Sequence, residues 1–384
     1  MTRRRVVHVL TVADSLIFVD TLVKVASVRG YEVTVVTSPD ARLEAFGKRL
    51  DVRTVAIEMP RRVSLLGDWV ALNHLRALFE RIRPDVVHAG TPKGGLLGML
   101  AAHATRVPVR LFHMRGLASA TTHGVLRGVL ETTERLSCGA ATHVICQSRS
   151  LREHVIAGGF VSRQKSDVIL EGSNGVDAEG RFVPQRYEAA GRALRARLGI
   201  ESEELVFGFV GRLVRDKGIP ELFRAFERLR ASGTRARLLV AGPFEPRDPV
   251  PPEVRAGLES HPQVHLLGAV DEPAVVYAAS DVVLLPSHRE GFPNVPLEAA
   301  AMGKPVITTR VPGCIDAVEE GVTGLLVGVD APEALAAAMG SYVTDPDLRR
   351  RHGLAGRERA LRTFSRDRIA EAMVELYDRE LAGI

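Results

Sequence analysis

The chain has 384 residues, of which 46% are apolar, 25% are charged and three are cysteines. Its length exceeds what one hydrophobic core usually organises, so we expect two domains, and its composition argues against a disordered chain. Three cysteines without metal-ligand spacing argue against a disulfide framework or a zinc site, and no stretch approaches the roughly twenty apolar residues of a membrane span.

Charge is unevenly distributed along the chain. Residues 1–173 contain 24 Lys and Arg against 15 Asp and Glu, a net charge of +9, whereas the remainder has 27 against 31, a net charge of −4. This imbalance suggests that the first half meets something anionic, such as nucleic acid, an anionic membrane face or a phosphorylated lipid. A solvated basic surface explains the excess equally well.

Short apolar runs alternate with longer amphipathic segments through the first half. The opening run after the basic N-terminus meets Asp14 too early for a signal peptide, and we expect it to form a strand. Near-continuous Val, Ile and Leu strands that alternate with helices indicate parallel βαβ units with both sheet faces covered. The expected strands are 6–12, 31–38, 52–57, 84–90, 107–114 and 141–148, with a helix at 65–82.

The alternation pauses at residues 170–177 and then restarts, which predicts a hinge and a second doubly wound domain. Expected strands are 205–213, 235–242, 263–269 and 281–287, and expected helices are 218–230 and 332–343. We therefore place one domain at 1–173 and the other at 174–364. In such sheets ligands bind beyond the carboxyl ends of the strands, so candidate site residues are sought just after each strand.

The segment GRLVRDKG directly follows the strand 205–213. It contains Arg212 and Lys217 on either side of a short turn into a helix. A planar guanidinium and a mobile ammonium beside a helix N-terminus suit a diphosphate. Taken alone, a solvated turn explains these two cations slightly better.

The segment SHREGFPNVPLE follows the strand 281–287. Asn294 is expected to cap a helix, because Pro296 stands early in that helix where its missing N–H is harmless. The free amides of the first turn can bind phosphate oxygens. Glu290 before the turn and Glu298 inside the helix can each accept hydrogen bonds from a different hydroxyl-bearing part of one ligand. The alternatives are a solvated loop acid for Glu290 and a helix-dipole partner for Glu298.

These motifs together resemble a retaining glycosyltransferase of family 4 with the GT-B fold: two doubly wound Rossmann-like domains with a cleft between them. EGFPNVPLE matches the E-x7-E motif of that family, GRLVRDKG its donor-diphosphate motif and SNGVD its crossing segment. VHAGTPKGGLLGMLAA and HMRGLAS are similar to bacterial members that build capsule, exopolysaccharide or O-antigen on a lipid carrier. The final segment, 365–384, is then expected to cross back onto the first domain.

The resemblance implies a role for each matching residue. Glu290, Arg212 and Lys217 would be catalytic: the two cations would stabilise the departing diphosphate, and Glu290 would bind hydroxyls of the transferred sugar near its reacting face. Glu298 would bind the ribose. The remaining expected substrate contacts are Phe292, Asn294 and Val295 in the phosphate loop, and Gly268 and Val270 against the base.

The chain departs from the family at two places. The first loop, Thr11–Phe18, lacks the Gly-Gly pair of many members. The usual His-Gly pair is replaced by HMRG, so we expect Arg115 to be a substrate-binding residue and His113 to be a core residue of the strand.

The resulting hypothesis is transfer of a sugar, with retention, from a nucleotide sugar that we expect to be UDP-linked to a polyprenyl-diphosphate-linked glycan. Family members are thought to use front-face substitution, without a metal or other cofactor. Asp345–Asp347 satisfies a metal-type D-x-D pattern but is better explained as a helix-capping turn. We expect a cytoplasmic protein, peripheral on the inner membrane face, that does not bind nucleic acid; its oligomeric state stays open.

Three alternatives remain. One is a nucleotide-sugar 2-epimerase of the same fold, one a non-catalytic sugar-nucleotide-binding subunit, and one a transferase that acts on a soluble metabolite. Two placements are open for Trp69 and its leucine neighbours: packing in the core, or a membrane-facing stripe beside Arg61 and Arg62. Core packing explains the spacing somewhat better.

Overall fold

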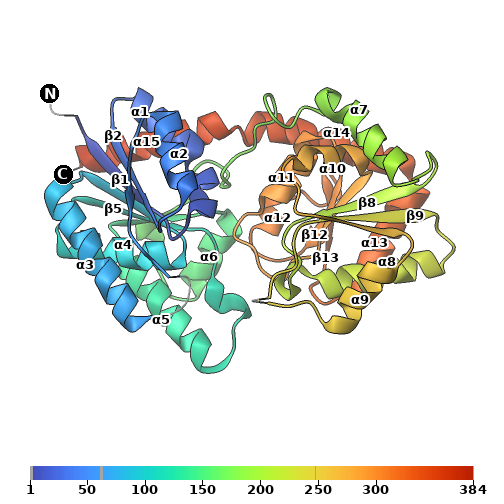
Figure 1. Ribbon diagram of the computed structural model, residues 1–384, viewed down its shortest axis with the longest axis horizontal. Coiled ribbons are helices and arrows are strands. Elements are labelled where there is room, and N and C mark those ends of the chain that lie inside the picture. Colours follow the sequence, from blue (N-terminus) through green and yellow to red (C-terminus); the bar gives the residue numbers. More distant parts are fainter. Residues whose placement is uncertain (1–2, 61–63, 247, 384) are drawn as a thin grey trace. The chain divides into compact units, whose positions relative to one another are not determined.

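The computed structural model describes residues 3–60, 64–246 and 248–383, and it divides into two compact units (Figure 1). The first unit comprises residues 1–174 and 366–384, and the second comprises residues 175–365. The chain therefore leaves the first unit after Asn174 and returns to it at Arg366.

The first unit is built on a seven-stranded parallel sheet with the order β3-β2-β1-β4-β5-β6-β7. The order reverses between β1 and β4, as in doubly wound folds, whose ligands bind beyond the carboxyl ends of the strands. The strands are β1 Arg5–Val9, β2 Glu32–Thr37, β3 Arg53–Ala56, β4 Val86–Gly90, β5 Val109–Met114, β6 His143–Cys146 and β7 Ser166–Asp167.

Helices cover both faces of this sheet, which explains why its strands are almost continuously apolar. One core lies beneath α1, α2 and α15, and the other beneath α3, α4, α5 and α6. The helices are α1 Asp20–Val28, α2 Ala41–Leu50, α3 Leu65–Ile82, α4 Pro92–Ala104, α5 Gly124–Ala140, α6 Arg149–Ala157 and α15 Arg366–Ala382, with short 3-10 turns η1 Ala13–Phe18, η2 Ala118–Thr121 and η3 Arg163–Lys165.

The second unit contains a six-stranded parallel sheet with the order β10-β9-β8-β11-β12-β13. Helices α8, α9 and α13 cover one face, and α7, α10, α11 and α14 cover the other. The strands are β8 Leu205–Val210, β9 Ala236–Ala241, β10 Val264–Gly268, β11 Val282–Leu285, β12 Val306–Thr309 and β13 Gly324–Val327. The helices are α7 Pro184–Arg197, η4 Arg215–Lys217, α8 Ile219–Ala231, α9 Pro252–Ser260, α10 Pro273–Ala279, α11 Asn294–Ala301, α12 Cys314–Ala317, α13 Pro332–Thr344 and α14 Pro346–Thr363.

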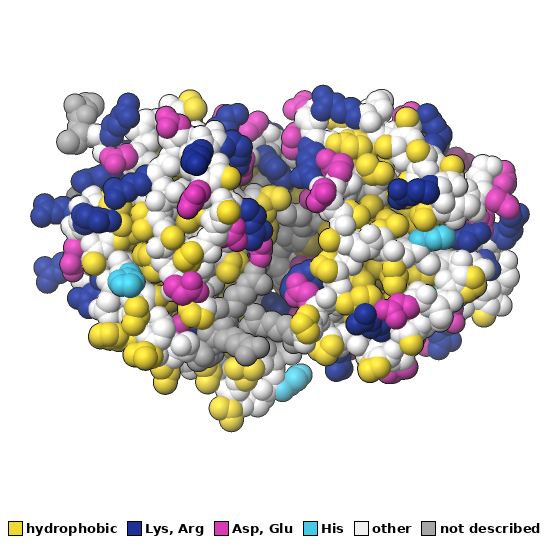
Figure 2. Space-filling model, in the orientation of Figure 1, with side chains coloured by type: hydrophobic (Ala, Val, Ile, Leu, Met, Phe, Trp, Pro, Cys, Tyr) yellow, Lys and Arg dark blue, Asp and Glu magenta, His cyan; other side chains and the backbone are white. Residues whose placement is uncertain are grey.

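The prediction that Trp69 packs in the core is wrong. Leu75, Leu78 and Phe79 of α3 are buried, but Trp69 in the second turn is 63% exposed. The apolar residues of the first turns therefore face away from the sheet, and hydrophobic side chains gather along the lower margin of this unit over α3 and α5 (Figure 2). Arg61 and Arg62, which the sequence analysis set beside this stripe, lie outside the described residues.

Within the described ranges, no helix is both long enough and apolar enough to cross a bilayer. The Asp345–Asp347 turn caps a helix, as predicted: the Asp345 carboxylate accepts a hydrogen bond from the Leu348 amide at 2.8 Å, at the start of α14.

Candidate functional site

The loops that follow β8 and β11 form the core of the candidate site. These strands are neighbours in a parallel sheet, so their carboxyl ends lie at the same edge. The η4 turn after β8 contacts the end of β11 directly, because Gly218 has a φ of +68° and lies against the Pro286 carbonyl. A Cβ at Gly218 would lie 2.0 Å from that oxygen, so only glycine fits.

We expect Gly218→Ala to lower the free energy of unfolding by roughly 2–5 kcal/mol, because a left-handed backbone costs alanine about 1–2 kcal/mol and the loop must also move away from β11. Gly199→Ala is the matched control, since Gly199 has a φ of +63° but no atom within 4 Å of its added Cβ. Urea unfolding of both variants measures the difference. Equal destabilisation would show that the approach to Pro286 is unimportant.

Lys217 and Glu290 form an ion pair at this edge. The Lys217 Nζ lies 2.5 Å from the Glu290 Oε1, and the two side chains are only 20% and 11% exposed. Such a largely buried pair contributes little net stability, because desolvation offsets the Coulomb attraction. The pair nevertheless places an ammonium beside a carboxylate, so that one polar ligand can contact both groups.

Arg212 lies at the same edge but is more exposed. Its guanidinium contacts Glu245, with 2.9 Å between Nη1 and Oε2, and its side chain is 58% exposed. The nearby backbone is tightly packed, because a Cβ on Gly242 would lie 1.8 Å from the Gly211 carbonyl oxygen. Arg212 is thus an exposed cation on a closely packed turn, and a more highly charged anion can compete with Glu245 for it.

The N-terminus of α11 supplies free amides beside this pair. Asn294 and Val295 are the first two helical residues, so their N–H groups have no partner within the helix. The predicted N-cap is wrong by one residue: the capping position is Pro293, and the structure shows no side-chain cap. Asn294 Oδ1 is buried without a hydrogen-bond partner among the described atoms, which leaves a polar atom near the first turn.

Phe292 and Gly291 are held in place by core packing. The Phe292 ring is 6% exposed and packs edge-on against Phe364, with 5.5 Å between ring centroids. Its ring is therefore a core group, and any ligand contact would come from its backbone. Gly313 presses on the same loop, since a Cβ there would lie 2.4 Å from the Gly291 carbonyl oxygen.

Glu298 is oriented by a tyrosine that sequence reasoning missed. The Tyr277 hydroxyl of α10 donates a hydrogen bond to Glu298 Oε2 at 2.7 Å. Tyr277 is fully buried, and burial together with the Glu298 charge raises its pKa well above the usual value. It therefore stays protonated and remains a donor. No sequence signal marked it, because its spacing is that of an ordinary core residue.

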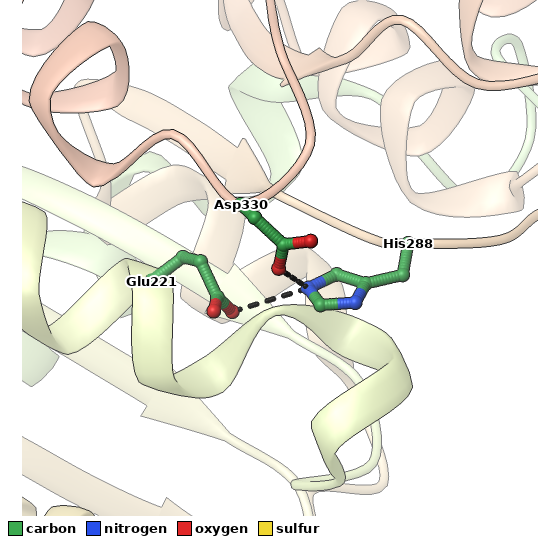
Figure 3. A group of neighbouring side chains, drawn as sticks. All are labelled: Glu221, His288 and Asp330. Carbon is green, nitrogen blue, oxygen red and sulfur yellow. Dashed lines mark hydrogen bonds and ion pairs between the residues drawn. The ribbon is translucent and has the colours of Figure 1, made fainter. Parts of the chain in front are cut away.

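His288, at the start of the same loop, lies between two acids (Figure 3). Its Nε2 is 3.2 Å from Glu221 Oε2 and 3.4 Å from Asp330 Oδ1. The hydrogen bond to Glu221 raises the pKa of His288 above its usual value, against the effect of burial. These three ligand atoms are close enough to bind a metal ion, but an imidazolium between two carboxylates accounts for the geometry fully.

A raised pKa makes the stabilisation by His288 depend on pH. Its contribution is complete below about pH 6.5, the unfolded pKa of histidine, and is lost as pH rises through the folded value. We expect His288→Gln to lower the thermal midpoint more at pH 5.5 than at pH 8.5. The midpoints of both proteins at the two pH values measure this, and a pH-independent difference would contradict it.

The expected base-binding segment lies at the end of β10. Gly268 is exposed with a φ of +67°, and its carbonyl already accepts a hydrogen bond from the Gly242 amide at 2.7 Å. Val270 is half-buried. The sheet order β10-β9-β8 brings these residues to the same edge as Arg212, two strands away.

Arg115 lies in the first unit, at the carboxyl end of β5. Its guanidinium donates hydrogen bonds to Asn174 and to Gln147 Oε1, the latter at 3.3 Å, and it lies over the Phe18 ring. Burial lowers the pKa of Arg115 to about 10, so it remains cationic at neutral pH. Its Nε is buried without a hydrogen-bond partner among the described residues.

Three buried histidines, His8, His88 and His113, lie close to Arg115. His113 is buried, as expected, and its Nδ1 lies 3.1 Å from His88 Nε2, while His88 Nδ1 contacts the Tyr377 hydroxyl of α15 at 2.5 Å. Burial lowers the pKa of His88 and His113 well below the usual value. Burial, with a smaller effect of Arg115, lowers the pKa of His8 to about 3. These rings are neutral at pH 7, so Arg115 is the cation of this cluster.

The first loop, Thr11–Phe18, packs against the start of α4 although it contains no glycine. Thr11 Oγ1 lies 2.7 Å from Thr91 Oγ1 and accepts a hydrogen bond from the Gly94 amide at 2.9 Å. Gly94 permits this approach, because a Cβ there would lie 2.9 Å from the Thr11 nitrogen. In this chain the close packing comes from Gly94 of α4, since the loop itself contains no glycine.

Two family descriptions match the chain, and each falls within one of the two units. "Glycosyl transferase 4-like domain" matches residues 19–172, and "Glycosyl transferases group 1" matches residues 204–345. Together these matches span most of both sheets and include the loops that follow β8 and β11.

Similar proteins cover almost the whole chain. It is 32% identical over 380 residues to the capsular polysaccharide biosynthesis glycosyltransferase CapM of Staphylococcus aureus, with 98% of each chain covered. It is 24% identical over 372 residues to the N,N'-diacetylbacillosaminyl-diphospho-undecaprenol alpha-1,3-N-acetylgalactosaminyltransferase of Campylobacter jejuni, with 94% of this chain and 95% of that chain covered. The structure of Anabaena HepE in complex with UDP-glucose shares the fold, with a TM-score of 0.80 at 19% identity over 98% of this chain and 99% of that chain.

Proposed function

Since this chain belongs to family 4 of the GT-B glycosyltransferases, we propose that it transfers a sugar from a UDP-sugar to a polyprenyl-diphosphate-linked acceptor during polysaccharide synthesis. The anomeric configuration is retained in this proposal. The observation that carries it is the Lys217–Glu290 pair at the N-terminus of α11, where an ammonium, a carboxylate and free amides meet at one sheet edge.

The donor diphosphate is proposed to bind at this edge. Lys217 and Arg212 neutralise its charge, and the amides of Asn294 and Val295 donate to its oxygens. Each cation contacts an acid in the structure, so binding exchanges a carboxylate partner for a phosphate of higher charge. These groups then stabilise the charge that develops on the leaving diphosphate. This stabilisation lowers the activation free energy of sugar transfer.

The hydroxyl groups of the donor are proposed to bind the two acids. Glu298, held by Tyr277, accepts from the ribose, and Glu290 accepts from the transferred sugar. The backbone of Gly268 and Val270 borders the base. The proposed chemistry is front-face substitution: the acceptor hydroxyl bonds to the anomeric carbon as the bond to the diphosphate breaks, and the departing diphosphate takes up the hydroxyl proton.

The names of two relatives and the charge of the first unit support a lipid-linked acceptor. The Campylobacter jejuni relative is named for a diphospho-undecaprenol acceptor, and the Staphylococcus aureus relative for capsular polysaccharide. The first unit, residues 1–174 and 366–384, contains 27 Lys and Arg against 20 Asp and Glu. We propose that Arg115 contacts the substrate in this unit, and that the protein works as a peripheral protein at the cytoplasmic membrane face.

A two-step experiment tests this function. A panel of nucleotide sugars scored by thermal shift identifies the donor, and a membrane extract incubated with the radiolabelled donor then reports lipid-linked product. We expect one UDP-sugar to raise the melting temperature and to label an organic-soluble product in the presence of chelator. NMR of a donor-only incubation excludes an epimerase. Label that appears only in a water-soluble product would replace the lipid with a soluble acceptor.

A further inference from the structure

The first turns of two helices in the first unit present large apolar side chains to solvent. In α3, Leu65 and Leu66 are 86% and 75% exposed and Trp69 is 63% exposed. In α5, Val125 and Leu126 are 87% and 53% exposed. Val70 and Val129 are also exposed. Together these side chains form the apolar rim, which comprises Leu65, Leu66, Trp69, Val70, Val125, Leu126 and Val129.

The apolar rim lies at the edge of the sheet where the substrate is proposed to bind. Helices α3, α4 and α5 each follow a parallel strand, so all three begin at the carboxyl edge. Lys93 at the start of α4 contacts Asp68 in the first turn of α3, with 2.6 Å between Nζ and Oδ1. The first turns of α3 and α4 are therefore neighbours at this edge.

The start of α5 extends beyond the sheet. Glu134, in the third turn, accepts hydrogen bonds from the Ala118 amide at 2.8 Å and the Ser119 hydroxyl at 2.6 Å, which ties this part of α5 to the turn after β5. The ten residues of α5 before Glu134 span about 15 Å at the usual helical rise. Val125 and Leu126 thus lie at the protruding end of the helix.

Exposed apolar side chains that gather on neighbouring helices indicate a binding surface, whereas single scattered ones do not. Further along, α3 buries a separate apolar stripe and α5 contributes Cys138 and Ala140 to the core, so the rim is additional to what the core requires. Beside the rim, Lys93 and Arg127 pair with Asp68 and Glu131, so the positive excess comes from the unit as a whole, whose net charge is +7. An anionic lipid surface complements this combination, whereas a second copy would bring like charge against like charge.

We propose that the apolar rim inserts into the headgroup region of an anionic phospholipid membrane and so presents the carboxyl edge of the first sheet to a lipid-linked acceptor. This inference rests on the proposed function for its purpose, but membrane binding is measurable without any sugar transfer. Tryptophan and leucine are typical of interfacial anchors, because one part of the side chain enters the acyl boundary while the backbone stays at the headgroups.

The full chain contains a single tryptophan, Trp69, so its fluorescence reports on the rim alone. Vesicles of phosphatidylcholine with about one third phosphatidylglycerol are expected to shift the emission to the blue, and brominated lipid is expected to quench it. Pure phosphatidylcholine vesicles bind more weakly, because each nearby basic residue contributes to binding at an anionic surface.

Co-sedimentation with the same vesicles tests the residues. Leu65→Ser/Leu66→Ser and Val125→Ser/Leu126→Ser are each expected to lower partitioning at least tenfold, since each loses two apolar side chains. Val28→Ser and Leu354→Ser are the matched controls, because these residues are 82% and 58% exposed but lie outside the rim. They are expected to partition like the unaltered chain.

Several results would overturn the proposal. These are an unchanged Trp69 emission with anionic vesicles, rim variants that bind like the controls, or a blue shift without vesicles that grows with protein concentration, which would indicate self-association. Labelling of lipid-linked acceptor on vesicles by rim variants at the unaltered rate would reject the rim and leave the proposed function standing. Vesicle binding through the rim without use of a lipid acceptor would reject that acceptor and leave the rim standing.

Discussion

Lys217→Ala is expected to lower kcat by a factor on the order of 10² to 10³, the loss typical of removing one preorganised group that stabilises transition-state charge. The Lys217 ammonium is held 2.5 Å from Glu290 at the edge where the diphosphate is proposed to depart. The donor KM should change less, because Arg212 and the α11 amides still bind the ground state. Initial rates over a range of donor concentrations separate the two effects.

A loss of folding must be distinguished from a loss of catalysis in this variant. Lys217→Ala leaves the Glu290 carboxylate, which is 11% exposed, without its cation, and an unpaired buried charge is destabilising. The double variant Lys217→Ala/Glu290→Gln removes that charge and should recover thermal stability without recovering turnover. Arg215→Ala, a change of an exposed cation in the same η4 turn, should keep full activity. Full turnover in Lys217→Ala would reject the diphosphate assignment.

Glu298→Ala is expected to weaken donor binding roughly 10- to 100-fold. A hydrogen bond to a charged group is worth about 1.5–3 kcal/mol, and this range corresponds to the loss of one such bond to the ribose in the alanine variant. The change also leaves the buried Tyr277 hydroxyl without its acceptor. Isothermal titration with UDP measures the dissociation constant directly, without any need to know the acceptor.

Tyr277→Phe separates the two roles of this pair. It keeps the Glu298 carboxylate and removes only the hydroxyl that orients it, so UDP affinity should fall less than in Glu298→Ala. Deoxyuridine nucleotides that lack a ribose hydroxyl provide the second control. They should bind more weakly than the ribonucleotides to the unaltered chain, but no more weakly to Glu298→Ala. Unchanged UDP affinity in Glu298→Ala would remove the ribose assignment.

The sequence by itself determined strands β1–β6 and β8–β11, helices α3, α8 and α13, and the loops that follow β8 and β11, but it did not mark β7, β12 or β13. Near-continuous Val and Ile runs identify strands buried on both faces, and parallel topology sends the following loops to one edge. The eight-residue separation of Glu290 and Glu298 predicts one acid before the helix and one inside it, as the structure has them. Local pattern is sufficient for these features because each depends on neighbours along the chain.

Only the tertiary structure decided which side chains pair with Glu290 and Glu298, and which face of α3 is exposed. Lys217 and Glu290 are 73 residues apart in sequence, and their pairing depends on the contact between η4 and the end of β11. Tyr277 and Glu298 meet across two helices, and nothing local marks that tyrosine. The helical spacing of Trp69 is compatible with either the buried or the exposed face, so its exposure was misjudged. Such features depend on which segments distant in sequence pack together, and periodicity within one segment contains no information about its distant neighbours.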